Sequence, residues 1–260
     1  IGGVLSGNGT LLKFGGGTLV VAPTDASGFS GTLRVTTGSI RVLSVAALGT
    51  NTGTTTSAPV DINGGIFEFR SDAALATGKN VYFRNGATLF VDHAPGGNAI
   101  NATHAFGNVS YEIANTYTFS GRNGYGSSFT TAPVVTGDGD STFTNNLNGT
   151  LSFSGSFWSN SNTAAARTLT LGGTGNTLIT GSLIASGGAS FDHVLVKSGT
   201  GTVTIAGTAA TLDGSTSTSS GPLVITDFRS LGGATNASVI NLGNTTTTSG
   251  TLTFGTSVAA

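Results

Sequence analysis

The stretch LVKSGTGTVTIAG, residues 195–207, reads as a lysine, a glycine corner and a short alternating strand that ends at another glycine. Nearly the same phrase, LKFGGGTLVVA, occupies residues 12–22. The equivalent positions are Lys13 and Lys197, Gly17 and Gly201, Leu19 and Val203, and Val21 and Ile205. A repeated corner-and-strand unit, rather than a catalytic cluster, therefore organises this chain.

The composition favours a folded chain with an apolar core. Charged residues make up 8% of the 260 residues, against roughly 25% in an ordinary soluble domain. Glycine is abundant, with 42 residues, which is also typical of disorder. Disordered chains, however, are poor in aromatic and β-branched residues. This chain holds 15 Phe and only 5 Pro, and its mean hydropathy is +0.20.

Charge and residue usage exclude several classes of function. A net charge of −1 provides no basic face for nucleic acid. No apolar run approaches the length of about 18 residues that a membrane-spanning helix needs. Without cysteine, neither a disulfide nor a thiolate zinc site can form. We expect no cofactor. Because the chain opens on Ile1 and lacks methionine, we expect it to be a segment of a longer protein.

The recurring local pattern is a strand of three to six residues followed by Gly, Asn, Ser or Thr, with almost no helical periodicity. Asn85-Gly86 and Gly64-Gly65 each stand between two such strands, which permits a series of hairpins as an alternative. Units of about 20 to 25 residues instead favour stacked coils. The sequence therefore predicts an all-β parallel β-helix, a β-solenoid of about a dozen coils with an irregular middle.

Strand alternation predicts which side chains enter the core of each coil. Leu19 and Val21, like Val203 and Ile205, should point inward, and the intervening Thr and Val residues outward. In coils about 4.8 Å apart, side chains of the same kind lie on top of one another. Stacked side chains of the same charge would repel one another along the rod, which accounts for the low content of charged residues. We expect each repeat lysine to mark a corner or to cap carbonyl groups on its outside.

The repeat divides the chain into two blocks within one β-helix segment, residues 1–260. Block A covers about residues 9–131, an irregular middle about 132–166, and block B about 167–260. The blocks also share a strand–glycine–strand unit, at residues 59–69 and 238–254. We therefore expect both blocks to repeat the same order of elements.

The pattern K-x-G-x-G-T-[LV]-x-[LVI], followed by Leu-Gly and then a strand–Gly-Gly–strand unit, resembles the autotransporter-associated β-strand repeat. The matching stretches are residues 13–49 and 169–232, with weaker continuation to Phe69 and Phe254, or roughly half of the chain. The Gly15-Gly16-Gly17 run departs from the usual spacing. The resemblance implies a right-handed parallel β-helix on the outer surface of a bacterium, without implying one activity.

The carboxylates are candidate catalytic residues because some parallel β-helices are enzymes that cleave polysaccharides. Such enzymes need two carboxyl groups, one on each side of the glycosidic bond. The only two glutamates are Glu68 and Glu112, and Glu68 lies on a strand where outward exposure is expected. Asp138 and Asp140 are a weak candidate pair for Ca²⁺. The sequence Gly-Asp-Gly-Asp is more typical of an ordinary turn, so we predict no metal site.

The histidines offer a second candidate for catalysis. Asp92-His93 and Asp192-His193 form a duplicate, and His104 is the third histidine. No Gly-x-Ser-x-Gly elbow accompanies them, and neighbours such as Asp92 and His93 should face opposite sides of a strand. We therefore predict no catalytic residues and no enzyme.

Three aromatic residues, Tyr117, Tyr125 and Trp158, could build a platform for sugar stacking. Packing in the solenoid core is the more frequent role of such residues. The sequence thus predicts a structural or adhesive protein, a stalk, adhesin passenger or self-associating fibre subunit, at the cell surface or outside a bacterium. The alternative is a carbohydrate-binding or carbohydrate-active module. Expected partners are further copies joined end to end, neighbouring segments of the same chain, or a glycan or host surface.

Overall fold

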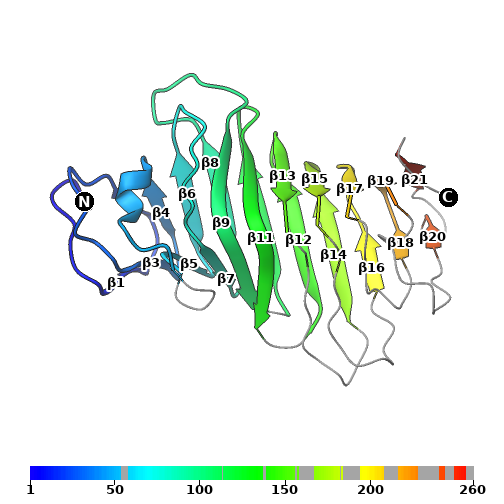
Figure 1. Cartoon of the computed structure of the whole chain (residues 1–260), viewed down its shortest axis with the longest axis horizontal. Helices are drawn as coiled ribbons and strands as arrows, with labels where there is room; N and C mark the ends of the chain where they lie inside the picture. The colour runs from blue at the N-terminus through cyan, green and yellow to red at the C-terminus, as the bar shows by residue number, and fades with distance from the viewer. Residues whose placement is uncertain are drawn as a thin grey trace.

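The computed structural model describes residues 1–53, 58–112, 114–136, 139–155, 157, 167–181, 183, 194–207, 216–227, 240–243 and 249–255, with only the backbone over 131–136. Within these residues the strands form two parallel sheets, one of eleven strands and one of ten. Each coil contributes one strand to each sheet, and the coils stack from the N-terminal to the C-terminal end of an elongated molecule (Figure 1). The predicted β-solenoid is confirmed.

The eleven-stranded sheet contains, in spatial order, β1 (Thr10–Lys13), β3 (Thr32–Val35), β5 (Val60–Asn63), β7 (Val81–Arg84), β9 (Thr103–Glu112), β11 (Gly126–Thr136), β13 (Thr150–Phe153), β15 (Asn176–Ile179), β17 (Val203–Ile205), β19 (Gly221–Ile225) and β21 (Gly250–Phe254). The ten-stranded sheet contains β2 (Thr18–Val21), β4 (Ser39–Val42), β6 (Ile66–Arg70), β8 (Thr88–Asp92), β10 (Thr116–Gly121), β12 (Ser141–Asn146), β14 (Thr168–Gly173), β16 (Val194–Lys197), β18 (Thr216–Thr218) and β20 (Ile240–Leu242). A single 3-10 turn, η1 (Val45–Leu48), interrupts the strand pattern of the described residues.

The Asn-Gly and Gly-Gly pairs form corners between the two sheets, so the hairpin alternative is wrong. Asn85 and Gly86 have φ values of 46° and 73° and connect β7 to β8, which belong to different sheets. Positive φ is easily reached by asparagine and glycine, and here it turns the chain out of one sheet and into the other. Gly64 has a φ of 93° and stands at the corresponding corner between β5 and β6.

Side chains follow the predicted alternation between core and surface. Val21, Val203 and Ile205 are buried, and Leu19 is half-buried on the same inward row of the first coil. Val20, between two inward residues, is 37% exposed. Period-two patterning therefore assigns the faces of these strands correctly.

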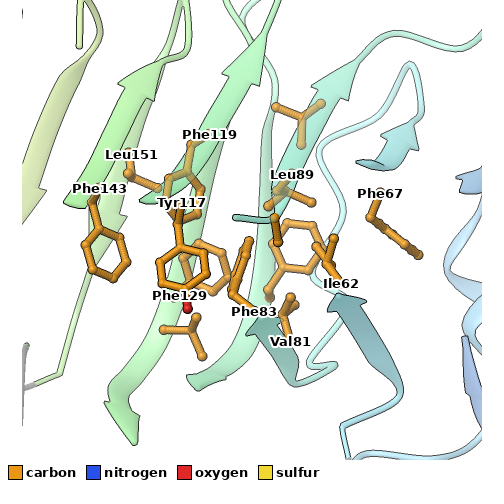
Figure 2. Close-up of a cluster of buried hydrophobic side chains, with 14 of the residues drawn as sticks. Ile62, Phe67, Val81, Phe83, Leu89, Tyr117, Phe119, Phe129, Phe143 and Leu151 are labelled. Atoms are coloured by element: carbon orange, nitrogen blue, oxygen red, sulfur yellow. The ribbon is translucent and has the colours of Figure 1, made fainter. Parts of the chain in front are cut away.

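Phenylalanine fills the middle of the core, where the rings stack from coil to coil (Figure 2). Phe106, Phe129 and Phe153 are register partners on β9, β11 and β13. Their ring centroids are 5.5 Å and 5.4 Å apart, with interplanar angles of 21° and 13°. Phe119 and Phe143 on the opposite sheet also stack, at 6.1 Å, although the register partner of Phe143 is Tyr117. In-register parallel pairing thus converts one sequence position into a continuous aromatic row.

Both sheets continue through the segment predicted to be irregular. β12 lies within residues 132–166 and pairs with β10 and β14, and β13 pairs with β11 and β15. Phe143, Leu151 and Phe153 face the core at alternate positions. The repeat phrase is lost in this segment, but the alternation of apolar residues that builds a coil is retained.

The two copies of the repeat phrase lie at different corners of the solenoid. Lys13 ends β1 of the eleven-stranded sheet, whereas Lys197 ends β16 of the ten-stranded sheet. The two sheets are exchanged in the same way in the shared strand–glycine–strand unit. This unit runs from the eleven-stranded to the ten-stranded sheet as β5 and β6, and in the reverse direction as β20 and β21. Both blocks keep the expected order, the phrase first and the strand–glycine–strand unit after it, but each element of block B begins in the other sheet. The phrase thus specifies a corner with its flanking strands and not the sheet in which it begins.

Candidate functional site

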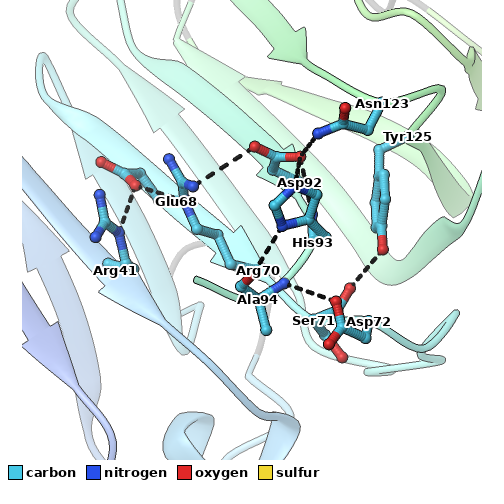
Figure 3. Close-up of polar contacts among 10 residues, drawn as sticks. All are labelled: Arg41, Glu68, Arg70, Ser71, Asp72, Asp92, His93, Ala94, Asn123 and Tyr125. Carbon is cyan, nitrogen blue, oxygen red and sulfur yellow. Dashed lines mark hydrogen bonds and ion pairs between the residues drawn. The ribbon is translucent and has the colours of Figure 1, made fainter. Parts of the chain in front are cut away.

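Charged residues on the outer face of the ten-stranded sheet form a ladder across three coils (Figure 3). Arg41 on β4 is the register partner of Glu68 on β6, and Arg70 on β6 is the register partner of Asp92 on β8. The Nε atoms of Arg41 and Arg70 both donate to Oε2 of Glu68, at 2.7 Å and 3.0 Å. Arg70 Nη1 lies 3.5 Å from Oδ2 of Asp92. We call these four residues the Glu68 ladder.

A second ladder occupies the outer face of the eleven-stranded sheet. Arg34 Nη2 lies 2.7 Å from Oδ2 of Asp61, and Arg84 Nε lies 3.3 Å from Oδ1 of the same carboxylate. Arg84 also reaches Oε1 of Glu112, at 3.6 Å, and its guanidinium carbon lies 4.0 Å from the ring centroid of Tyr82. The sign of the charge therefore alternates from residue to residue along both ladders.

Alternating charge allows acidic side chains to stack in a solenoid. Like charges at the spacing of neighbouring strands would destabilise the sheet, whereas opposite charges attract. The ladder also covers its carboxylates, since the Glu68 side chain is only 11% exposed although it points outward. Burial by itself raises the pKa of Glu68, but the hydrogen bonds and charges of Arg41 and Arg70 outweigh it and hold that pKa below its usual value.

Replacing Glu68 with glutamine should destabilise the protein at neutral pH, by about 2 kcal/mol, because two partly buried guanidinium groups lose their shared anion. The lowered pKa means that unfolded Glu68 binds its proton more tightly than folded Glu68 does. Its stabilising effect is thus complete above the ordinary pKa of 4.5 and is lost as the pH falls through the folded value. Urea unfolding at neutral and acidic pH measures both effects.

Asp25 provides the matched control for the Glu68 ladder. Its carboxylate is exposed and accepts hydrogen bonds from the N–H and the hydroxyl of the neighbouring Ser27. Asp25→Asn should leave the free energy of unfolding nearly unchanged at neutral pH. An unfolding difference for Glu68→Gln that stays the same on acidification would contradict the assigned role of the ladder.

The repeat lysines bind backbone carbonyl groups at corners and approach them from the inside of the coil. Lys197 is 1% exposed and lies on the inward row of β16, opposite Leu171 and Thr218. The acceptors of its Nζ are the carbonyl oxygens of Ser198, Gly199 and Ser220, at 2.9, 2.8 and 3.0 Å. The acceptors of Lys13 Nζ are those of Phe14, Gly15, Gly16 and Thr37, at 3.1, 2.5, 3.3 and 3.3 Å. These contacts agree with the expectation that the repeat lysine marks a corner, and the ammonium group reaches the carbonyl groups from the inward row because strand alternation turns this position inward.

Lys79, the third lysine of the chain, binds corner carbonyls as well. Its Nζ donates to the carbonyl oxygens of Gly49 and Asn51 in the preceding coil, both at 2.7 Å. Burial lowers the pKa of Lys79, and burial lowers the pKa of Lys197 to about 8. Each ammonium group links two successive coils and satisfies carbonyl groups that leave the sheet at the corner.

Asp92 and His93 lie in contact, contrary to the prediction that they face opposite sides. His93 Nε2 is 4.0 Å from Oδ1 of Asp92, and His93 Nδ1 is 2.7 Å from the carbonyl oxygen of Ala94. Alternation does not apply because β8 ends at Asp92 and His93 follows it. Asp92 Oδ1 also accepts hydrogen bonds from the N–H of His93 and from Nδ2 of Asn123, at 2.9 and 2.7 Å. Asp192 and His193 lie outside the described residues.

The other acidic candidates do not converge. Glu68 and Glu112 lie on the outer faces of different sheets, so they do not flank one bond. Asp140 accepts a hydrogen bond from the N–H of Thr168, at 2.8 Å, and thereby links two coils. Asp138 lies outside the described residues. In the part of the chain that the structure describes, no three His, Asp or Glu residues are grouped to hold a metal ion.

Two of the three aromatic candidates are core residues. Tyr117 and Tyr125 are both fully buried, so neither contributes to an exposed stacking platform. The Tyr117 hydroxyl donates to the carbonyl oxygen of Glu112, and burial raises the pKa of Tyr117. Trp158 lies outside the described residues.

The arginine–carboxylate ladders are the feature that sequence reasoning missed. The sequence does contain a signal for these pairs. Arg34 and Asp61 are 27 residues apart, and Arg41 and Glu68 are also 27 residues apart. The shared spacing matches one coil in this region, where Leu33 on β3 pairs with Val60 on β5. A search for opposite charges at coil spacing would have identified these pairs.

Comparison of the chain with models of protein families finds no match. Comparison with curated proteins finds none either, and the same holds for solved structures. Over the described residues, no helix has the length and apolar character needed to span a membrane. The contacts of the charged, histidine and aromatic residues are therefore the basis for a functional proposal.

Proposed function

We propose that this chain is a structural or adhesive β-helical segment of a bacterial surface or extracellular protein, acting as a stalk, an adhesin passenger or a subunit of a self-associating fibre. The main support is that its outward carboxylates are paired with arginines. The outward carboxylates of Asp61, Glu68 and Asp92 are bound by arginines of the same or neighbouring coils. Cleavage of a glycosidic bond would instead need two carboxyl groups on either side of that bond. Catalysis forms no part of the proposal.

The resemblance to the autotransporter-associated repeat supports this assignment. Lys13 and Lys197, the residues that begin the repeat phrase, both fasten corners by binding carbonyl oxygens of two successive coils. The phrase thus has a structural role at each place where it occurs. A repeat that specifies architecture fits a protein whose work is to extend a rod.

Association of copies end to end is the mode that the open edges favour. β1 and β2 each pair with one neighbour, on the side of β3 and β4. Ile1 binds the carbonyl oxygen of Val20 and the N–H of Ala22 at the outer edge of β2. The rest of the outer edges of β1 and β2 carries backbone groups that a further coil, from a longer chain or from a second copy, can bind. Since the pairs are parallel, a second copy would add its last coil to this edge, and repetition of that contact gives an open filament.

Electron microscopy of the purified chain tests this proposal, with two neighbouring substitutions on β2. Leu19 belongs to the inward row that an added coil would cover, whereas Val20 points to the side of the rod. Leu19→Asp should prevent the joining of rods, and Val20→Asp should leave joined rods in place. Isolated short rods from the unsubstituted chain would contradict self-association. Specific binding to a glycan array, without joined rods, would favour a carbohydrate-binding module.

A further inference from the structure

A histidine is buried in the core of the solenoid among aromatic residues. His104 on β9 is 0% exposed, and its ring meets that of Phe69 edge-on, with centroids 4.7 Å apart. The ring of Tyr125 lies 5.3 Å away. Ser127, the register partner of His104 on β11, is also fully buried. Neither ring nitrogen of His104 makes a hydrogen bond of good geometry, so the protein provides poor solvation for an imidazolium ion at this place.

The surroundings of His104 favour its neutral form. Burial lowers the pKa of His104 to about 4, and an interaction with the backbone of Asp92 opposes this shift only in part. An exposed histidine titrates near pH 6.5. An open state in which water reaches the ring therefore binds a proton more tightly than the closed state does.

The contacts around His104 fasten the segment 71–79, which leads from β6 to β7. The hydroxyl of Tyr125 donates to the carbonyl oxygen of Ser71, at 2.8 Å. Next to His104, the carbonyl oxygen of Ala105 accepts a hydrogen bond from the N–H of Thr77, at 2.7 Å. We call His104, Tyr125 and this segment the His104 corner. Tyr125 provides one of the aromatic rings against the imidazole, and its displacement would break the bond to Ser71.

We infer that the His104 corner is an acid-sensitive element: mild acidification protonates His104, opens its contact with Tyr125 and releases the segment 71–79 while the remaining coils stay paired. Local opening is expected in a solenoid because each coil contacts only its neighbours. Acid thereby exposes backbone groups of this segment at one side of the rod.

Besides His104, the corner and the elements packed around it carry the titratable groups Tyr125, Asp92, Asp72 and Lys79. Asp72 accepts a hydrogen bond from the N–H of Ala94, and Lys79 binds the carbonyl oxygen of Gly49. Tyr125 stays neutral in acid, since burial and the carboxylates of Asp72 and Asp92 raise its pKa. The Asp92 carboxylate is bound by Arg70, by Asn123 and by the N–H of His93. β6 and β11 contribute Phe69 and Ser127, which do not titrate. His104 is thus the group of this corner that changes charge between about pH 4 and pH 7.

Hydrogen exchange read by mass spectrometry, corrected for the intrinsic pH dependence of exchange, tests the inference. For the unsubstituted chain, the opening constant of segment 71–79 should rise by up to about tenfold for each pH unit of acidification between about pH 6.5 and pH 4. The total change is on the order of a hundredfold. A segment remote from the corner, such as residues 39–48, should show no such rise.

His104→Phe and His104→Gln should abolish the rise, because neither side chain binds a proton in this range. His93→Gln, at the half-exposed histidine that follows β8, is the matched control and should preserve it. An equal rise in the His104 variants would overturn the inference. If neither His104 variant folds, an NMR titration of the unsubstituted chain decides: His104 should remain neutral to about pH 5, and titration near pH 6.5 would refute the inference.

Discussion

Replacing Phe119 with alanine should lower the free energy of unfolding by about 3–5 kcal/mol, because it opens a cavity in the aromatic middle of the core. Phe119 is fully buried, and its ring centroid lies 5.3 Å from that of Phe83 and 6.1 Å from those of Phe143 and Phe153. These partners belong to three other strands, which leaves the surrounding coils little freedom to collapse into the space. Urea unfolding followed by circular dichroism measures the loss.

Ser120 is the matched control for this cavity. It follows Phe119 on β10 and points to the outside of the sheet, where it is half-buried. Ser120→Ala should change the free energy of unfolding by less than about 0.5 kcal/mol. Equal losses at the two positions, or a loss below about 1 kcal/mol for Phe119→Ala, would show that the aromatic rows do not carry the stability of this region.

Replacing Gly201 with alanine should lower the free energy of unfolding by about 3 kcal/mol or more. A Cβ atom at Gly201 would lie 2.1 Å from the carbonyl oxygen of Gly175 in the preceding coil. The N–H of Gly201 donates to the carbonyl oxygen of Gly173, at 3.1 Å. A methyl group would therefore force apart two coils that approach each other through their backbones.

Gly16, in the other copy of the phrase, supplies the comparison for Gly201. A Cβ atom there meets nothing within 4 Å, because the first coil has no neighbour on that side among the described residues. Gly16→Ala should leave stability within about 0.5 kcal/mol of the unsubstituted chain. Thermal unfolding of both variants by differential scanning calorimetry separates them, and similar melting temperatures would contradict the close approach at Gly201.

The charged ladders show where sequence reasoning stopped short. Glu68 alternates with Phe67 and Phe69, which correctly predicts that it points outward. Its burial could not be predicted from this pattern, because the arginine that covers it from the preceding coil stands 27 residues earlier. The other inter-coil pair of this ladder, Arg70 with Asp92, is 22 residues apart, and Asn123, which also binds Asp92, stands 31 residues after it. Partners at varying distance along the chain become neighbours only after the coils have stacked.

Lys13 and Lys197 illustrate the same limit. Their phrase predicts a lysine at a glycine corner, and the structure places both ammonium groups against corner carbonyls. The same phrase begins in the eleven-stranded sheet at Lys13 and in the ten-stranded sheet at Lys197. Local sequence cannot distinguish these two settings. Every such corner connects a strand of one sheet to a strand of the other sheet, whichever of the two comes first.

The sequence by itself determined the parallel β-solenoid, the inward rows such as Val203 and Ile205, and the glycine corners, since these depend on alternation and backbone freedom within a few residues. The stacking of coils decided every contact that joins residues of two different coils. It paired Glu68 with Arg41, placed Lys197 Nζ against the carbonyl oxygen of Ser220, buried His104 and brought Gly201 close to Gly175. The physical reason is that these contacts join residues about one coil apart, and the corner and loop lengths that set each coil's register vary along the chain.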